Sequence, residues 1–268
     1  MLNLAKHAMK KLVILFSVFT IVFTNSVFCQ FKIVSIPNGL SYNQSALQIG
    51  STIDSTASIE FSDEVSVEPF IVCTPELEFY ELDRNLLVLG TVSESKKRIK
   101  LGESRGFQKK EQSIPDLALF FGDNQFTIFG DSVNLELDAT TYPLSQNFNI
   151  VFAYKIGSEP QAKKIGFDNQ TLHLRQSELA QGKTGVNTDG IFQKLSIYSF
   201  QPENPQQKKK ICTFNLQFVP ENTLALQCKA ILDTKNPNAP ESIKKFINYL
   251  YGKTIAKQVE SVLSKTAP

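Results

Sequence analysis

The sequence predicts a mainly β protein, with antiparallel strands of sandwich or barrel type in two β-rich parts and one amphipathic α-helix at the C-terminus. Three observations lead to this fold class. Short runs of alternating apolar and polar residues recur along the chain, separated by Gly, Pro, Asn or Asp, as is typical of strands and turns. A strongly basic stretch near the middle divides these runs into two groups. Near the end, apolar residues instead recur at intervals of three and four, which is the period of a helix.

The N-terminus has the layout of a secretory signal peptide. Three lysines and no acid precede the apolar run at residues 12–23, and polar residues follow at 24–26. The run is shorter than the roughly twenty apolar residues of a transmembrane helix, so a retained anchor is the less favoured alternative. We predict a signal peptide at residues 1–29, cleavage before Gln30 and no transmembrane span after its removal. Met1 and Met9 are both candidate start residues.

The expected location is therefore outside the cytoplasm, in the periplasm, at the cell surface or in the medium of a bacterium. The chain carries 28 Lys and Arg against 26 Asp and Glu. Removal of the three leader lysines leaves 25 bases against 26 acids. A nearly neutral mature chain gives no general attraction to polyanions, so we expect no nucleic-acid partner.

Residues 30–92 are predicted as an N-terminal β-rich domain. The runs FKIVSI, ASIEF, VSVEPFIV and NLLVLGTV supply its strands, because each combines β-branched or aromatic residues with turn residues on either side. Pro69 should lie at a sheet edge or a bulge, since proline has no N–H to donate.

Residues 116–232 are predicted as a second β-rich domain, and residues 233–268 as the C-terminal helix. The segment LALFFGDNQFTIF is expected to form a hairpin of two Phe-rich strands around a GDN turn, and NFNIVFAYKI, TLHLR and GIFQKLSIYSF are further strands. The helix is indicated by the spacing of Ile243, Phe246, Ile247 and Leu250.

The basic stretch occupies residues 93–115, which we predict to be a linker or an exposed loop. The alternative is a patch that binds an anionic surface or partner, such as membrane headgroups, a polyanion, an acidic partner or another envelope protein. Its seven bases are Lys96, Lys97, Arg98, Lys100, Arg105, Lys109 and Lys110.

Three cysteines remain after the leader, and two of them are candidates for a disulfide. The segment ICTFNLQFVPENTLALQC is interpreted as two strands around a turn near Pro220, which would make Cys212 and Cys228 cross-strand neighbours. The alternative is that both are small buried hydrophobic residues. Cys73 has no evident partner and is expected in the core.

The motif GESRG matches the G-x-S-x-G pattern that holds the nucleophile of α/β-hydrolases. By that resemblance Ser104 is the nucleophile, His173 the base, and an acid such as Asp123, Asp131 or Asp168 completes the triad. The context argues against it, because the motif follows the charged run KKRIKL instead of a buried strand, and no helix can extend far beyond it before a proline.

No other motif indicates catalysis. QGKTG lacks the first glycine of a phosphate loop, and a single histidine after the leader does not favour a metal site. We therefore assign no catalytic, cofactor-binding or metal-binding residue and expect no cofactor. The favoured function is binding or scaffolding, without enzymatic activity, in the cell envelope. The alternative is a secreted hydrolase, either a carboxylate-pair glycosidase or an esterase that uses Ser104 and His173.

Overall fold

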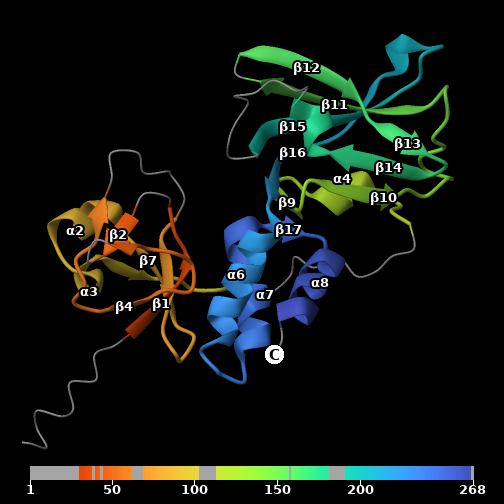
Figure 1. The fold of residues 1–268 in the computed structure, drawn as a ribbon. Coiled ribbons are helices and arrows are strands. Elements are labelled where there is room, and N and C mark those ends of the chain that lie inside the picture. The colour runs from red at the N-terminus through yellow and green to blue at the C-terminus, as the bar shows by residue number, and fades with distance from the viewer. Residues whose placement is uncertain are drawn as a thin grey trace, which may run out of the picture.

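The computed structural model describes residues 30–37, 40–42, 45–61, 69–102, 113–156, 158–180 and 191–266. The predicted signal peptide lies outside these ranges. The described chain is mainly β, with several antiparallel sheets and additional helices, and each sheet is open at both edges (Figure 1). The mainly β prediction is confirmed, whereas a closed barrel is not found among the described strands.

The first part of the chain builds an antiparallel five-stranded sheet with the order β4-β1-β6-β7-β8. A separate small sheet has the order β3-β2-β5. The strands are β1 (Gln30–Ser35), β2 (Leu40–Tyr42), β3 (Ser45–Ala46), β4 (Thr52–Asp54), β5 (Glu60–Phe61), β6 (Ile71–Cys73), β7 (Phe79–Leu82) and β8 (Lys96–Arg98).

Both faces of the five-stranded sheet are buried. One face carries Phe31 and Ile33 of β1 and packs against Leu87 of helix α2 (Arg84–Leu89) and Val92 of helix α3 (Val92–Ser95). The opposite face carries side chains from β1, β6 and β7 and packs against helices from the end of the chain. A sheet covered on both faces explains why its strands are more apolar than simple alternation requires.

The prediction of a strand at NLLVLGTV is wrong, because α2 and α3 occupy this segment. The Asp83 side chain accepts hydrogen bonds from the backbone N–H groups of Asn85 and Leu86, which caps α2. Thr91 and Glu94 form a capping box that starts α3. These polar residues set the local structure of an apolar segment.

The second part of the chain builds two sheets that pack around one shared core. The six-stranded sheet has the order β12-β11-β15-β16-β9-β17, and the three-stranded sheet the order β10-β14-β13. Their bounds are β9 (Gln125–Phe129), β10 (Ser132–Glu136), β11 (Asn149–Ile156), β12 (Glu159–Lys164), β13 (Gly166–Asp168), β14 (Thr171–Arg175), β15 (Ile191–Phe200), β16 (Lys209–Val219) and β17 (Lys253–Thr254).

Two pairings in the larger sheet are parallel, unlike the antiparallel arrangement predicted. β9 lies between β16 and β17 and runs parallel to both. The short helix α5 (Gln176–Ala180) follows β14, and the 3-10 helix η1 (Pro205–Gln207) lies between β15 and β16.

The predicted hairpin at LALFFGDNQFTIF is also wrong in its first half. Helix α4 (Leu117–Phe121) forms there, because the Asp116 carboxylate accepts hydrogen bonds from the N–H groups of Ala118 and Leu119. The helix places Phe121 in the core, where its ring stacks on Phe214 at 4.4 Å between centroids.

The C-terminus contains three helices in place of the single one predicted, namely α6 (Glu221–Leu232), α7 (Ala239–Tyr251) and α8 (Ala256–Thr266). Pro220 is the N-cap of α6 and not the centre of a hairpin turn. Gly252 ends α7 with a φ of +67°, where a Cβ would lie 2.7 Å from the carbonyl oxygen of Gln125. Only glycine suits that position, since it combines a left-handed backbone with close contact.

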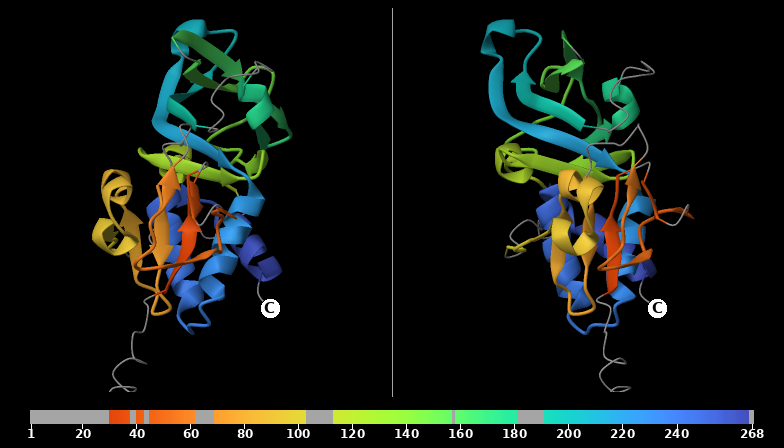
Figure 2. Two further views of the ribbon diagram at one scale, coloured as in Figure 1. Left: turned by 60° about the vertical axis from the view of Figure 1, so that its left-hand side comes forward. Right: turned by 90° about the vertical axis from the view of Figure 1, so that its left-hand side faces the viewer.

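These helices join the two parts of the chain. Phe246 and Ile247 of α7 and Leu224 of α6 share one core with Val34 and Phe79 of the first sheet. Figure 2 shows the helices against the face of that sheet. On leaving α7, the chain enters β17 and pairs with β9 of the second sheet. The C-terminal segment is therefore integral to both parts.

We predict that Phe246→Ala lowers the free energy of unfolding by about 3 to 5 kcal/mol, the usual range for truncating a buried aromatic side chain. Phe246 is fully buried and stacks on Phe79 at 5.4 Å between ring centroids. Urea denaturation measures the change. Leu119→Ala is the control, because Leu119 is 72% exposed, and it should change stability by no more than about 0.5 kcal/mol. A loss below about 1 kcal/mol for Phe246→Ala would contradict the shared core.

Candidate functional site

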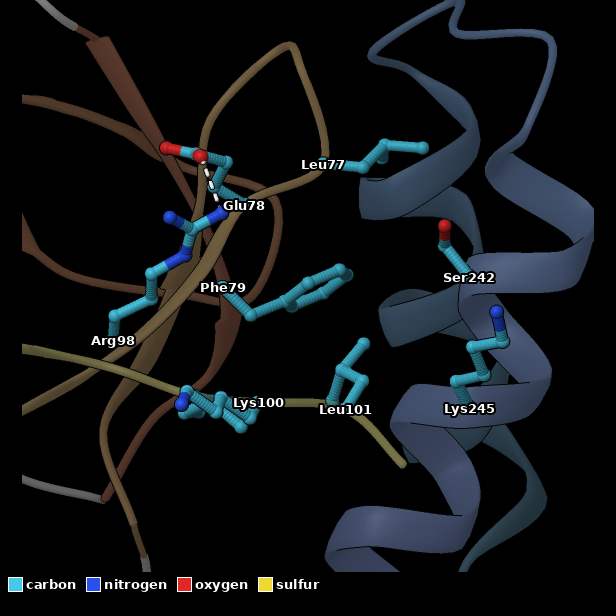
Figure 3. Close-up of a pocket in the computed structure, with 9 residues that line it drawn as sticks. Leu77, Glu78, Phe79, Arg98, Lys100, Leu101, Ser242 and Lys245 are labelled. Carbon is cyan, nitrogen blue, oxygen red and sulfur yellow. Dashed lines mark ion pairs between the residues drawn. The ribbon is translucent and has the colours of Figure 1, made fainter. Parts of the chain in front are cut away.

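A groove lies where the ends of β7 and β8 meet the first turns of α7 (Figure 3). We call it the β8 groove. Its volume is about 460 Å³, which is within the range of small-ligand and short-peptide sites. It is lined by Leu77, Glu78, Phe79, Arg98, Ile99, Lys100, Leu101, Ser242 and Lys245.

A tight turn between β6 and β7 places Leu77 at the groove. The N–H of Leu77 donates to the carbonyl of Thr74 at 3.0 Å, and the N–H of Thr74 donates to the carbonyl of Glu78 at 3.0 Å. Leu77 adopts a φ of +63°, a left-handed conformation that is uncommon for a side chain of its size. The surrounding hydrogen bonds hold the turn in this conformation.

In the β8 groove, the sheet side chains that point toward α7 are apolar, and those that α7 contributes are polar (Figure 3). Leu77, Phe79 and Leu101 extend from the sheet toward α7, as Figure 3 shows, and the stack of Phe79 on Phe246 fixes this side of the groove to the helix. Ser242 and Lys245 stand on α7 opposite. An amphipathic occupant could therefore bury an apolar group and present a polar or charged group.

The lining of the β8 groove carries an excess of positive charge. Three of its lining residues are basic, Arg98, Lys100 and Lys245, and one is acidic, Glu78. The Arg98 guanidinium lies 2.6 Å from a Glu78 carboxylate oxygen, and the other oxygen of Glu78 accepts a hydrogen bond of 2.7 Å from the Tyr80 hydroxyl. Lys245 pairs with Glu241 at 3.8 Å on the exposed helix surface, a contact of low strength in water.

The predicted basic patch is only partly within the described residues. Lys96, Lys97 and Arg98 form β8, so the segment predicted to be a linker contains the end of α3 and then a strand of the first sheet. Lys96 lies over the rings of Phe31 and Tyr80, with its ammonium nitrogen 5.4 and 5.3 Å from their centroids. Lys97 and Lys100 are exposed. The remaining predicted residues, Arg105, Lys109 and Lys110, lie outside the described ranges.

The esterase alternative gains no support from the histidine. His173 lies on β14, and its Nδ1 atom is 2.9 Å from the amide oxygen of Asn134 on β10. The recorded partner is thus an amide and not one of the candidate acids. The predicted nucleophile Ser104 lies outside the described residues.

Within the described ranges, no group of three or more His, Cys, Asp or Glu side chains is arranged to hold a metal ion. Nor does any helix in those ranges combine the length and apolar character needed to cross a bilayer.

The three cysteines within the described ranges are free thiols in the structure. Cys212 lies on β16 and packs against the core of the second part, whereas Cys228 lies on α6 in the core shared with the first sheet. The hairpin that would have made them neighbours is absent, since α6 replaces its second strand. Cys73 is buried in β6, as expected.

Comparison with known proteins identifies no matching family model, no matching curated protein and no matching solved structure.

Arg98 and Lys100 of the β8 groove belong to the basic patch predicted from the sequence, whereas the other lining residues were not predicted. Ser242 and Lys245 are separated from β8 by most of the chain, and no local pattern links them to it. Leu77 and Leu101 have the appearance of ordinary strand-flanking residues. The turn residues TPELE were the available signal that β6 and β7 form a hairpin.

We predict that the three described thiols react with an alkylating agent only when the protein is unfolded. Burial raises the pKa of Cys73 and Cys228 to about 12 and that of Cys212 to about 11, so at pH 8 they are protonated and poorly nucleophilic. Mass spectrometry after iodoacetamide treatment should show no rapid adduct on the native mature protein. Unfolding without a reductant should yield an adduct on each thiol. Blockage of Cys212 and Cys228 until a reductant is added would instead indicate a disulfide.

Proposed function

We propose that the protein acts by binding in the cell envelope and that its binding surface is the β8 groove with the neighbouring bases of β8. The observation that carries the proposal is that one groove is lined both by apolar side chains and by Arg98, Lys100 and Lys245. This combination favours an anionic partner with apolar groups, such as an acidic envelope protein, because charge steers the encounter and apolar burial supplies affinity. A scaffolding role follows if the partner belongs to a larger assembly.

The envelope location rests on the basic and apolar leader at residues 1–29. We predict that expression in a bacterium yields a mature protein in the extracytoplasmic fraction. Sequencing of its N-terminus should begin at Gln30, because the proposed cleavage precedes that residue. A protein that retains Met1 or Met9 in the cytosol would contradict export.

Charge reversal of the β8 groove tests the binding surface. We predict that the double variant Lys100→Glu, Lys245→Glu binds a fluorescent acidic peptide at least tenfold more weakly than the unchanged protein, as measured by anisotropy. The binding of the unchanged protein should also weaken with salt.

The matched control is Lys155→Glu, Lys210→Glu, which alters charge equally at exposed positions on β11 and β16. It should change affinity by less than about twofold if only screened long-range charge is lost. Equal losses in both double variants would show attraction by net charge alone. No loss in the groove variant would overturn the proposed surface.

A further inference from the structure

The β8 groove lies beside a sheet edge whose hydrogen-bonding groups face outward. β8 ends the five-stranded sheet, and no described strand pairs with its outer edge. The N–H of Ile99 donates to the carbonyl of Phe79 at 2.8 Å, and the N–H of Asp83 donates to the carbonyl of Ser95 at 2.9 Å. In an antiparallel pair every second residue bonds inward. The backbone groups of Lys96 and Arg98 therefore point away from β7.

The two faces of β8 differ in chemistry. Lys96 and Arg98 lie on the face with Tyr80, where the rings of Phe31 and Tyr80 and the Glu78 carboxylate contact them. Lys97 lies on the opposite face and is exposed, and Ile99, which directly follows β8, lies on that same face in the core shared with α7. Because side chains alternate along a strand, a strand added beside β8 would present one set of side chains to the bases and the other to α7.

The positive charge of β8 favours some strands over others as pairing partners for its outer edge. Basic residues on an edge strand protect it from pairing with other chains, and a second copy of β8 would place like charges side by side. An acidic strand would instead meet opposite charges, and cross-strand pairs of opposite charge stabilise a sheet. Apolar residues at alternate positions would face the groove wall formed by Leu77, Phe79 and Leu101.

Resting on the proposed function, we infer that β8 binds an extended peptide segment of its partner by strand addition, with acidic and apolar residues in alternation. The acidic side chains lie on the side of Arg98, and the apolar side chains enter the β8 groove beneath them. Main-chain hydrogen bonds hold the peptide along β8, while the alternating side chains supply specificity.

A peptide with alternating Glu and Val is the direct probe. The fluorescent hexapeptide Glu-Val-Glu-Val-Glu-Val should bind at least tenfold more tightly than Glu-Glu-Glu-Val-Val-Val, which has the same composition and charge. In an antiparallel added strand, the glutamates lie on the side of Arg98 and direct their backbone N–H groups toward β8. N-methylation of the glutamates should abolish binding, whereas N-methylation of the valines should reduce it by less than threefold.

A matched pair of protein variants tests the same edge from the other side. Arg98→Ala removes a charge, and Arg98→Pro additionally removes the outward N–H while leaving the inward bonds to β7 in place. The proline variant should bind the alternating peptide at least tenfold more weakly than the alanine variant. Thermal unfolding of both variants checks that each is folded. If Arg98→Pro does not fold, the N-methylated peptides still test strand addition.

The outcomes separate this inference from the proposed function. Equal binding of the two hexapeptides, with both lost on charge reversal of Lys100 and Lys245, would overturn strand addition and keep the anionic surface. Unchanged binding of both N-methylated peptides would likewise overturn strand addition and keep the anionic surface. Failure of every acidic peptide to bind would overturn both proposals. Dimerisation that Arg98→Pro abolishes would assign the edge to a second copy of this chain and overturn the acidic ligand.

Discussion

The packing of the C-terminal helices on the first sheet is the contact on which the rest of the structure depends. Phe246 of α7 stacks on Phe79 of β7, and both rings lie in a core that also includes α6 and α8. Burial of side chains of this size contributes about 1.5 to 3 kcal/mol each relative to exposure. The β8 groove exists because this contact sets α7 beside the ends of β7 and β8, so stability and the proposed binding surface share one cause.

Hydrogen bonds tie the same helices to the second part of the chain. The Thr127 hydroxyl donates to the carbonyl of Tyr251 at 2.7 Å in a buried position. The Gln258 side chain accepts from the N–H of Phe129 at 3.2 Å and donates to its carbonyl at 2.8 Å. These bonds continue along β9 beyond its short pairing with β17, where buried backbone groups need partners. The helices are thereby fixed to both parts.

Sequence reasoning recovered the strands whose pattern is local and missed the elements set by caps and distant contacts. TLHLR and NFNIVFAYKI alternate cleanly and form β14 and β11. LALFF and NLLVLG have the apolar content of strands but become α4 and α2, because Asp116 and Asp83 cap them. Those caps were visible in the sequence, whereas the pairing of Phe79 with Phe246, on which the groove depends, has no local signal.

Hydrogen exchange at β8 tests the central claim most directly, namely that the outer edge of this strand is a binding site. In the free protein the amides of Lys97 and Ile99 should be protected, because they bond to β7, and those of Lys96 and Arg98 should exchange rapidly. Addition of the alternating acidic peptide should slow exchange at Lys96 and Arg98 by at least tenfold. Unchanged exchange at both amides under saturating peptide would contradict the account.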